Sequence, residues 1–172
     1  MGRTTDLRRE IKRAFIPHIT AKGFVVDMRD APQFFTFRQI TAHAVNVCDI
    51  QWEKYGRPRF VVNFGKCGAH GVILRGQRIP PDDITPYHGI VRGRLHPGGR
   101  RTTRGWFRQD RPLLERIVSW SQLYAPQEVI VKLIALFGEV EDFWNSGQVG
   151  PHIHLVAGPA KIDLKNFCDE HA

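Results

Sequence analysis

The chain contains only three cysteines, and none of them belongs to a Cys-x-x-Cys pair. The odd number and the missing spacing argue against a disulfide framework and against a cysteine-based zinc site. We therefore interpret Cys48, Cys67 and Cys168 as reduced thiols of an intracellular protein, each a small buried or incidental side chain rather than a nucleophile or a metal ligand.

Long apolar runs are also missing. No stretch approaches the roughly 18 consecutive apolar residues that a membrane-spanning helix needs. The residues from Met1 to Asp6 include no apolar segment of a secretory signal, and Asp6 stands where a myristoylation pattern has Ser or Thr. These observations predict a soluble, cytoplasmic protein.

Enzyme signatures are missing as well: the sequence has no Gly-x-Ser-x-Gly, no Walker A loop, no Gly-x-Gly-x-x-Gly and no His-Glu-x-x-His. Asp82 and Asp83 follow two prolines, as in a turn, and Glu139 and Asp142 have the spacing of a solvated helix face. We find no catalytic constellation and expect no cofactor. The sequence favours a protein that is not an enzyme.

Size and composition indicate one domain over residues 1–172, because 42% hydrophobic and 24% charged residues are ordinary globular values. Its centre is a β-rich stretch, Gln33–Gly65. Three runs in it, Gln33–Ile40, Ala44–Trp52 and Arg59–Gly65, are separated by short polar or turn-like breaks, which predicts an antiparallel meander.

Two helices are predicted on either side of the meander. Thr5–Lys22 has apolar residues at helical spacing, with a kink or break expected near Pro17, and Pro126–Asn145 has the clearest helical periodicity. Further short strands are expected near residues 24–29, 72–74, 90–95 and 152–156. The predicted fold is α+β: a mostly antiparallel sheet of five or six strands, with the N-terminal helix and the long C-terminal helix packed on one face.

Positive charge is concentrated in one segment. The chain has a net charge of +8, and Tyr87–Arg111 contains seven arginines and a single acidic residue. It belongs to a Gly/Pro/Arg-rich arm, residues 66–111; residues 158–172 are expected to be a loosely attached tail. Guanidinium groups bind phosphates and carboxylates, and aromatic rings stack on bases, so the arm indicates either polyanion binding or a basic surface loop with an aromatic anchor. The candidate binding residues of the arm are Arg92, Arg94, Arg100, Arg101, Arg104, Trp106 and Arg108.

Two smaller groups of residues are further candidates. Gln51, Asn63 and Arg38 are polar residues in apolar strands, so they either form the floor of a polar pocket or satisfy backbone groups. His152 and His154 would point the same way from a strand and so suggest a weak metal site, although two exposed histidines explain the pattern equally well.

The order Gly23-Phe24, Phe37-Arg38, Gln51 and Phe60-x-x-Asn63-x-Gly65 resembles a family of small bacterial proteins, domain-of-unknown-function family 4304. The resemblance covers roughly Leu7–Phe107, with Arg94-Leu95 and Trp106 in the positions of later family motifs. It implies an α+β domain of bacterial origin with no assigned chemistry, and it supplies no catalytic residues.

The leading functional hypothesis is therefore a non-enzymatic binding or interaction domain that uses the arm toward an acidic or protein partner. The alternatives are a nucleic-acid-binding protein that uses the same arm and a metal-dependent hydrolase that uses His152 and His154. We expect any site to lie where the polar residues of the meander meet the arginine arm.

Overall fold

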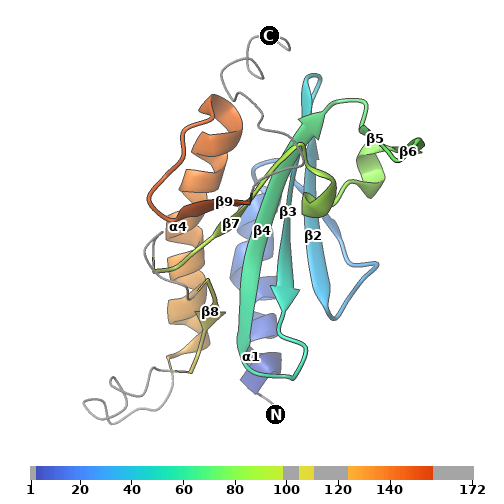
Figure 1. The fold of residues 1–172 in the computed structure, drawn as a ribbon. Coiled ribbons are helices and arrows are strands. Elements are labelled where there is room, and N and C mark those ends of the chain that lie inside the picture. Colours follow the sequence, from blue (N-terminus) through green and yellow to red (C-terminus); the bar gives the residue numbers. More distant parts are fainter. Residues whose placement is uncertain (1–2, 99–104, 111–123, 157–172) are drawn as a thin grey trace.

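The structure is a computed structural model that describes residues 3–98, 105–110 and 124–156. Its main element is an antiparallel seven-stranded sheet in the order β1-β2-β3-β4-β7-β9, with β8 paired to the start of β4 beside β7 (Figure 1). The strands are β1 (Val25–Asp27), β2 (Phe34–Ile40), β3 (Ala44–Trp52), β4 (Arg59–Gly68), β7 (Val91–Leu95), β8 (Phe107–Arg108) and β9 (Ile153–Val156).

The predicted meander is confirmed as β2, β3 and β4, which form the middle of the sheet. β3 is buried along almost its whole length, as its apolar side chains on both faces predict. The sheet has seven strands rather than five or six. The strand that the sequence does not reveal is β8, whose two residues are too few to form an alternating pattern.

The N-terminal helix runs through three consecutive segments, α1 (Arg3–Glu10), η1 (Ile11–Phe15) and α2 (Ile16–Thr20). The middle segment is a π-helical turn, in which the Ile16 amide donates to the carbonyl of Ile11. Pro17 has no amide hydrogen, and its ring would crowd the carbonyl four residues earlier in a regular helix. The wider turn accommodates this irregularity, so the chain stays helical where a kink or break is predicted, and Ile11 and Phe15 stay buried.

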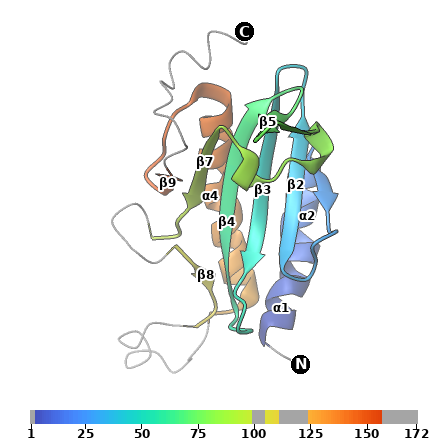
Figure 2. The same ribbon diagram turned by 45° about the vertical axis from the view of Figure 1, so that its right-hand side comes forward.

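The long C-terminal helix is confirmed as α4 (Pro126–Ser146), and it packs on the same face of the sheet as the N-terminal helix (Figure 2). It ends at Gly147, whose φ of 72° is the left-handed conformation that glycine adopts readily. The core between helices and sheet is rich in phenylalanine. The Phe15 ring lies 5.5 Å from Phe37 on β2 and 5.4 Å from Phe137 on α4, edge to face in both pairs.

The arm, residues 66–111, is built into this fold where the structure describes it. After β4 it forms a separate hairpin of β5 (Val72–Leu74) and β6 (Gln77–Ile79), then two single turns, η2 (Pro81–Asp83) and η3 (Pro86–His88), and then β7 and β8. The turns cross the sheet face opposite the helices. There Ile84 joins Val45, Val47 and Cys67 in a small second core.

Trp106-Phe107 anchors the far end of the arm, as the sequence predicts. The Phe107 ring is buried and lies parallel to Phe60 at 5.3 Å. None of the helices within the described residues is both long and apolar enough to cross a membrane.

Replacement of Phe137 by alanine tests the packing between the two helices and the sheet. The ring is fully buried and also contacts Trp144 at 5.9 Å, so its removal leaves a cavity where both helices meet. We expect Phe137→Ala to lower the free energy of unfolding by about 3–5 kcal/mol in urea denaturation. Val131→Ala on the same helix, where the side chain is 67% exposed, should change it by less than about 0.5 kcal/mol. Equal effects of the two substitutions would contradict this packing.

Candidate functional site

A row of polar side chains crosses the sheet face that the helices leave open. The strand registers place Thr36 opposite Asp49, Asp49 opposite Asn63, Asn63 opposite Arg94 and Arg94 opposite His154. Directly opposed residues in neighbouring strands project to the same side of a sheet. The strands β2, β3, β4, β7 and β9 therefore bring these five side chains into one line on the open face.

Asn63 is the hydrogen-bonding centre of this row. Its Nδ2 donates to Oδ1 of Asp49 at 2.8 Å and to Oε1 of Gln51 at 3.2 Å, and its Oδ1 accepts from Nε of Arg94 at 2.9 Å. Both N–H groups of the amide are used in this way. Asn63 therefore fixes the orientation of three side chains that belong to two neighbouring strands.

A pocket of about 430 Å³ lies above this centre, within the size range of small-molecule sites. Its lining combines a polar floor with apolar walls. The polar side chains are Asp49, Gln51, Asn63, Arg92 and Arg94, and the remaining lining residues are Phe34, Phe64, Pro86, Tyr87, Gly93 and Val156.

Two glycines allow η3 to form one wall of this pocket. A Cβ atom on Gly65 would lie 3.0 Å from the carbonyl oxygen of Pro86, and one on Gly89 would lie 3.1 Å from Cα of Gly65. Without these Cβ atoms η3 packs directly on the backbone of β4, which places Pro86 and Tyr87 beside the polar floor.

The two arginines of the pocket differ in their support. Arg94 is held through Nε by Asn63, whereas the guanidinium of Arg92 lies 5.1 Å from the centre of the Tyr87 ring, and its Nε is buried without a hydrogen-bond partner. Among the described residues neither arginine forms an ion pair with a carboxylate. In contrast, Arg29 and Arg38 both pair with Asp27.

Asp49 is the buried acid of the pocket. Burial raises the pKa of its carboxyl to about 6, although the hydrogen bond from Asn63 and the positive charge of Arg94 both act in the opposite direction. The side chain therefore changes charge close to neutral pH.

The structure brings together four of the predicted site residues: Gln51 and Asn63 from the meander, and Arg92 and Arg94 from the arm. Arg38 lies outside the pocket. It is buried, pairs with Asp27 at 2.6 Å and donates to the carbonyl of Ile84, so it holds the η2 segment on the sheet.

The other arm candidates lie elsewhere or outside the described residues. The ring of Trp106 is covered by the guanidinium of Arg59 at 4.6 Å, and Arg108 lies 4.0 Å from Asp110. Neither lines the pocket. Arg100, Arg101 and Arg104, like the tail 158–172 and Cys168, lie outside the described residues.

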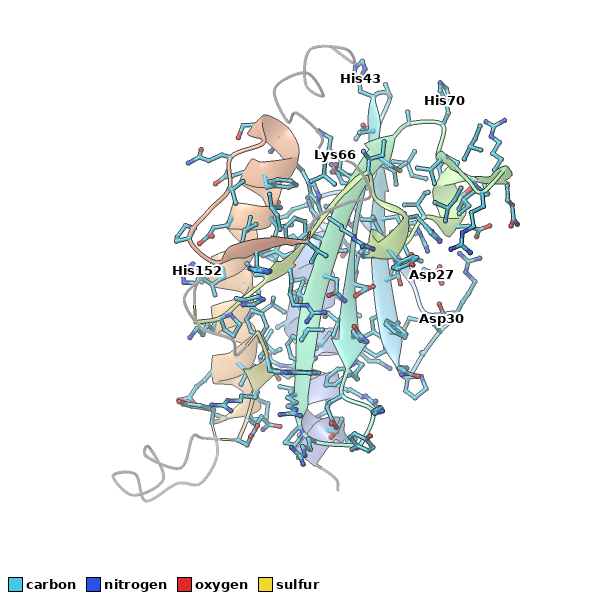
Figure 3. All side chains as sticks on the ribbon, viewed as in Figure 1. Asp27, Asp30, His43, Lys66, His70 and His152 are labelled. Atoms are coloured by element: carbon cyan, nitrogen blue, oxygen red, sulfur yellow. The ribbon has the colours of Figure 1, made fainter. Side chains whose placement is uncertain are left out.

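The two histidines have different neighbours. His152 precedes β9 and turns toward α4, where its backbone N and its Nδ1 lie 2.8 and 2.6 Å from the carboxylate of Glu139 (Figure 3). His154, inside β9, stacks on His96 with ring centres 5.3 Å apart. In the part of the chain that the structure describes, no three His, Cys, Asp or Glu side chains are grouped so that they could hold a metal ion.

Seven of the eleven residues that line the pocket were not candidate site residues from the sequence, among them Asp49, Phe34 and Tyr87. Asp49 lies two residues before Gln51 and so on the same face of the strand, and this spacing is the signal that identifies Asp49 as a pocket residue. Tyr87 stands out only as an aromatic residue beside the arginines of the arm, and Phe34 carries no comparable signal. Their places in the wall depend on the path of η3 and on the register of β2.

A family model described as "Domain of unknown function (DUF4304)" matches residues 33–134, which is more than half of the chain. The chain belongs to this family. The matched region runs from β2 into the first half of α4, so it includes every pocket residue except Val156. The comparison with curated proteins gives no significant match, and neither does the comparison with solved structures.

Asp49→Asn tests the buried carboxyl through the pH dependence of stability. The pKa of Asp49 rises from 3.8 to about 6 on folding, so between these values the folded state binds more protons than the unfolded state. The contribution of this group to the free energy of unfolding therefore falls by about 2–3 kcal/mol in total as the pH rises through that interval. Above the interval it stays at the lower value. D49N cannot titrate, so its free energy of unfolding should increase relative to wild type between pH 4 and pH 7.

Urea denaturation at several pH values measures this difference. D142N, which removes an exposed carboxyl on α4, is the matched control and should show no comparable trend. A difference between D49N and wild type that stays constant from pH 4 to pH 7 would contradict the raised pKa.

Proposed function

We propose that this protein is a non-enzymatic binding domain, and that Arg92 and Arg94 hold an acidic group of its partner in the open-face pocket. The observation that carries the proposal is the pair of guanidinium groups that line one pocket without a carboxylate partner among the described residues. Guanidinium groups bind carboxylates and phosphates through paired hydrogen bonds, and such charge-assisted bonds are stronger in a partly enclosed site than in open water.

The surroundings of the two arginines support this assignment. Nε of Arg92 is buried and has no hydrogen-bond partner, which costs free energy unless a ligand atom accepts its hydrogen bond. The Nη atoms of Arg94 take no part in the hydrogen bond between Nε and Asn63. The pocket volume suits a small molecule or one terminal group of a protein partner. We place this activity in the bacterial cytoplasm, where buried thiols such as Cys48 and Cys67 stay reduced.

Arg94→Gln tests the proposal with 3-phenylpropanoate, a carboxylate whose ring suits the apolar walls. Loss of a charge-assisted contact of about 1.5–3 kcal/mol predicts an affinity roughly 10- to 100-fold weaker by isothermal titration calorimetry. The matched control is Arg78→Gln on the exposed β5–β6 hairpin, which removes the same charge outside the pocket. We expect R78Q to bind as wild type does.

Two results would overturn the proposal. One is the absence of carboxylate binding by the wild-type protein, and the other is equal loss of affinity in R94Q and R78Q, which would indicate a general effect of charge. Circular dichroism of both variants shows whether they are folded.

Nucleic-acid binding is the second candidate, because Tyr87–Arg111 has seven arginines and one acidic residue. A labelled single-stranded oligonucleotide, titrated at about 50 and 200 mM salt, tests it, since phosphate contacts weaken steeply with salt. Under the leading proposal R94Q and R78Q reduce any such binding equally. Selective loss in R94Q would assign the pocket to nucleic acid, and no binding at low salt would end this alternative.

A further inference from the structure

The floor of the pocket holds a positive and a negative side chain that do not pair with each other. Arg94 and Asp49 lie on either side of the amide of Asn63, which bonds to Nε of one at 2.9 Å and to Oδ1 of the other at 2.8 Å. They form no direct ion pair. One amide group therefore separates the two charges and fixes their spacing.

The hydrogen bonds to the side chain of Asn63 use one atom of each charged group, Oδ1 of Asp49 and Nε of Arg94. Oδ2 of Asp49 and the Nη atoms of Arg94 take no part in them, and both residues line the pocket. The amide nitrogen of Gln51 is likewise outside its bond to Asn63, because that bond uses Oε1. The floor thus offers the N–H donors of Arg94 on the β7 side of Asn63. On the β3 side it offers the carboxylate acceptor of Asp49 together with the amide donor of Gln51.

A ligand that carries only an acidic group would satisfy half of this floor. It would place a second negative charge near Asp49 and remove the remaining water from that carboxyl without supplying a positive partner. Both effects are unfavourable for a carboxylate that is only 7% exposed to solvent. A ligand with an ammonium group beside its carboxylate would pair with both charges. The apolar walls, including Phe34, Tyr87 and Val156, would then face the rest of the ligand.

We propose that the pocket binds a small zwitterion, an α-amino acid with an apolar or aromatic side chain. Its carboxylate contacts Arg94 and Arg92, its ammonium contacts Asp49, and its side chain lies against Phe34 and Tyr87. This inference rests on the proposed function, because the carboxylate site is the same, and it adds the ammonium site and the chemical class of the ligand.

Pairs of ligands that differ only in the amino group test the inference. L-Phenylalanine is compared with 3-phenylpropanoate, and L-leucine with 4-methylpentanoate, so that side-chain size does not decide the result. Phenethylamine, which lacks the carboxylate, completes the set. By calorimetry at pH 7.5 we expect at least one amino acid to bind wild type about tenfold or more tightly than its deaminated partner, and phenethylamine to bind weakly.

Asp49→Asn should remove this preference, so that each amino acid and its deaminated partner bind the variant with similar affinity. D142N is the control of equal charge change on the other side of the molecule and should keep the preference. R94Q should weaken both members of each pair.

The possible failures are distinguishable. Equal binding of amino acids and deaminated acids, with both lost in R94Q, would overturn the zwitterion site and leave the acidic-group proposal intact. A preference for amino acids that persists in D49N would overturn the role of Asp49. No binding of any of these ligands by wild type would contradict both proposals.

Discussion

The arrangement of the polar side chains on the open face of the sheet depends on one side-chain amide, that of Asn63 in the middle of β4. The neighbouring residues Val62 and Phe64 point into the core, so this strand must satisfy an apolar layer on one side and a polar centre on the other. Asn63 is half-buried, and a side-chain amide that is partly removed from water is stabilised when its donors and its acceptor are paired. Asp49, Gln51 and Arg94 provide these partners, and in doing so they are held in a fixed arrangement.

The two layers of the fold have separate roles. Both helices cover one face and, with the phenylalanine core, give the sheet the rigidity on which a precise site depends (Figures 1 and 2). Among the described residues, the other face is covered at one end, where Arg38 and Ile84 hold the η2 segment. From this segment the chain continues through η3 to β7, and the close approach of Gly65 and Gly89 permits this path. The pocket lies between this part of the chain and the polar row.

Periodicity along the chain predicts the elements here far better than it predicts the site. The meander and α4 follow from apolar residues at spacings of two or of three to four, while two-residue β8 and the π turn before Pro17 produce no such pattern. The polar candidates Gln51 and Asn63 stand out as exceptions in apolar strands, and Arg92 and Arg94 stand out by charge. Their meeting depends on register between strands distant in sequence, which no local pattern specifies.

The most direct test of the central claim is to map the shifts of side-chain NMR signals on titration with L-phenylalanine. We expect the largest changes in the amide NH₂ groups of Gln51 and Asn63 and in the Nε–H of Arg94, because these groups form the floor of the pocket. Changes concentrated at the indole N–H of Trp106 and at Arg108, with the pocket signals unmoved, would contradict this expectation and place binding at the β8 end of the arm.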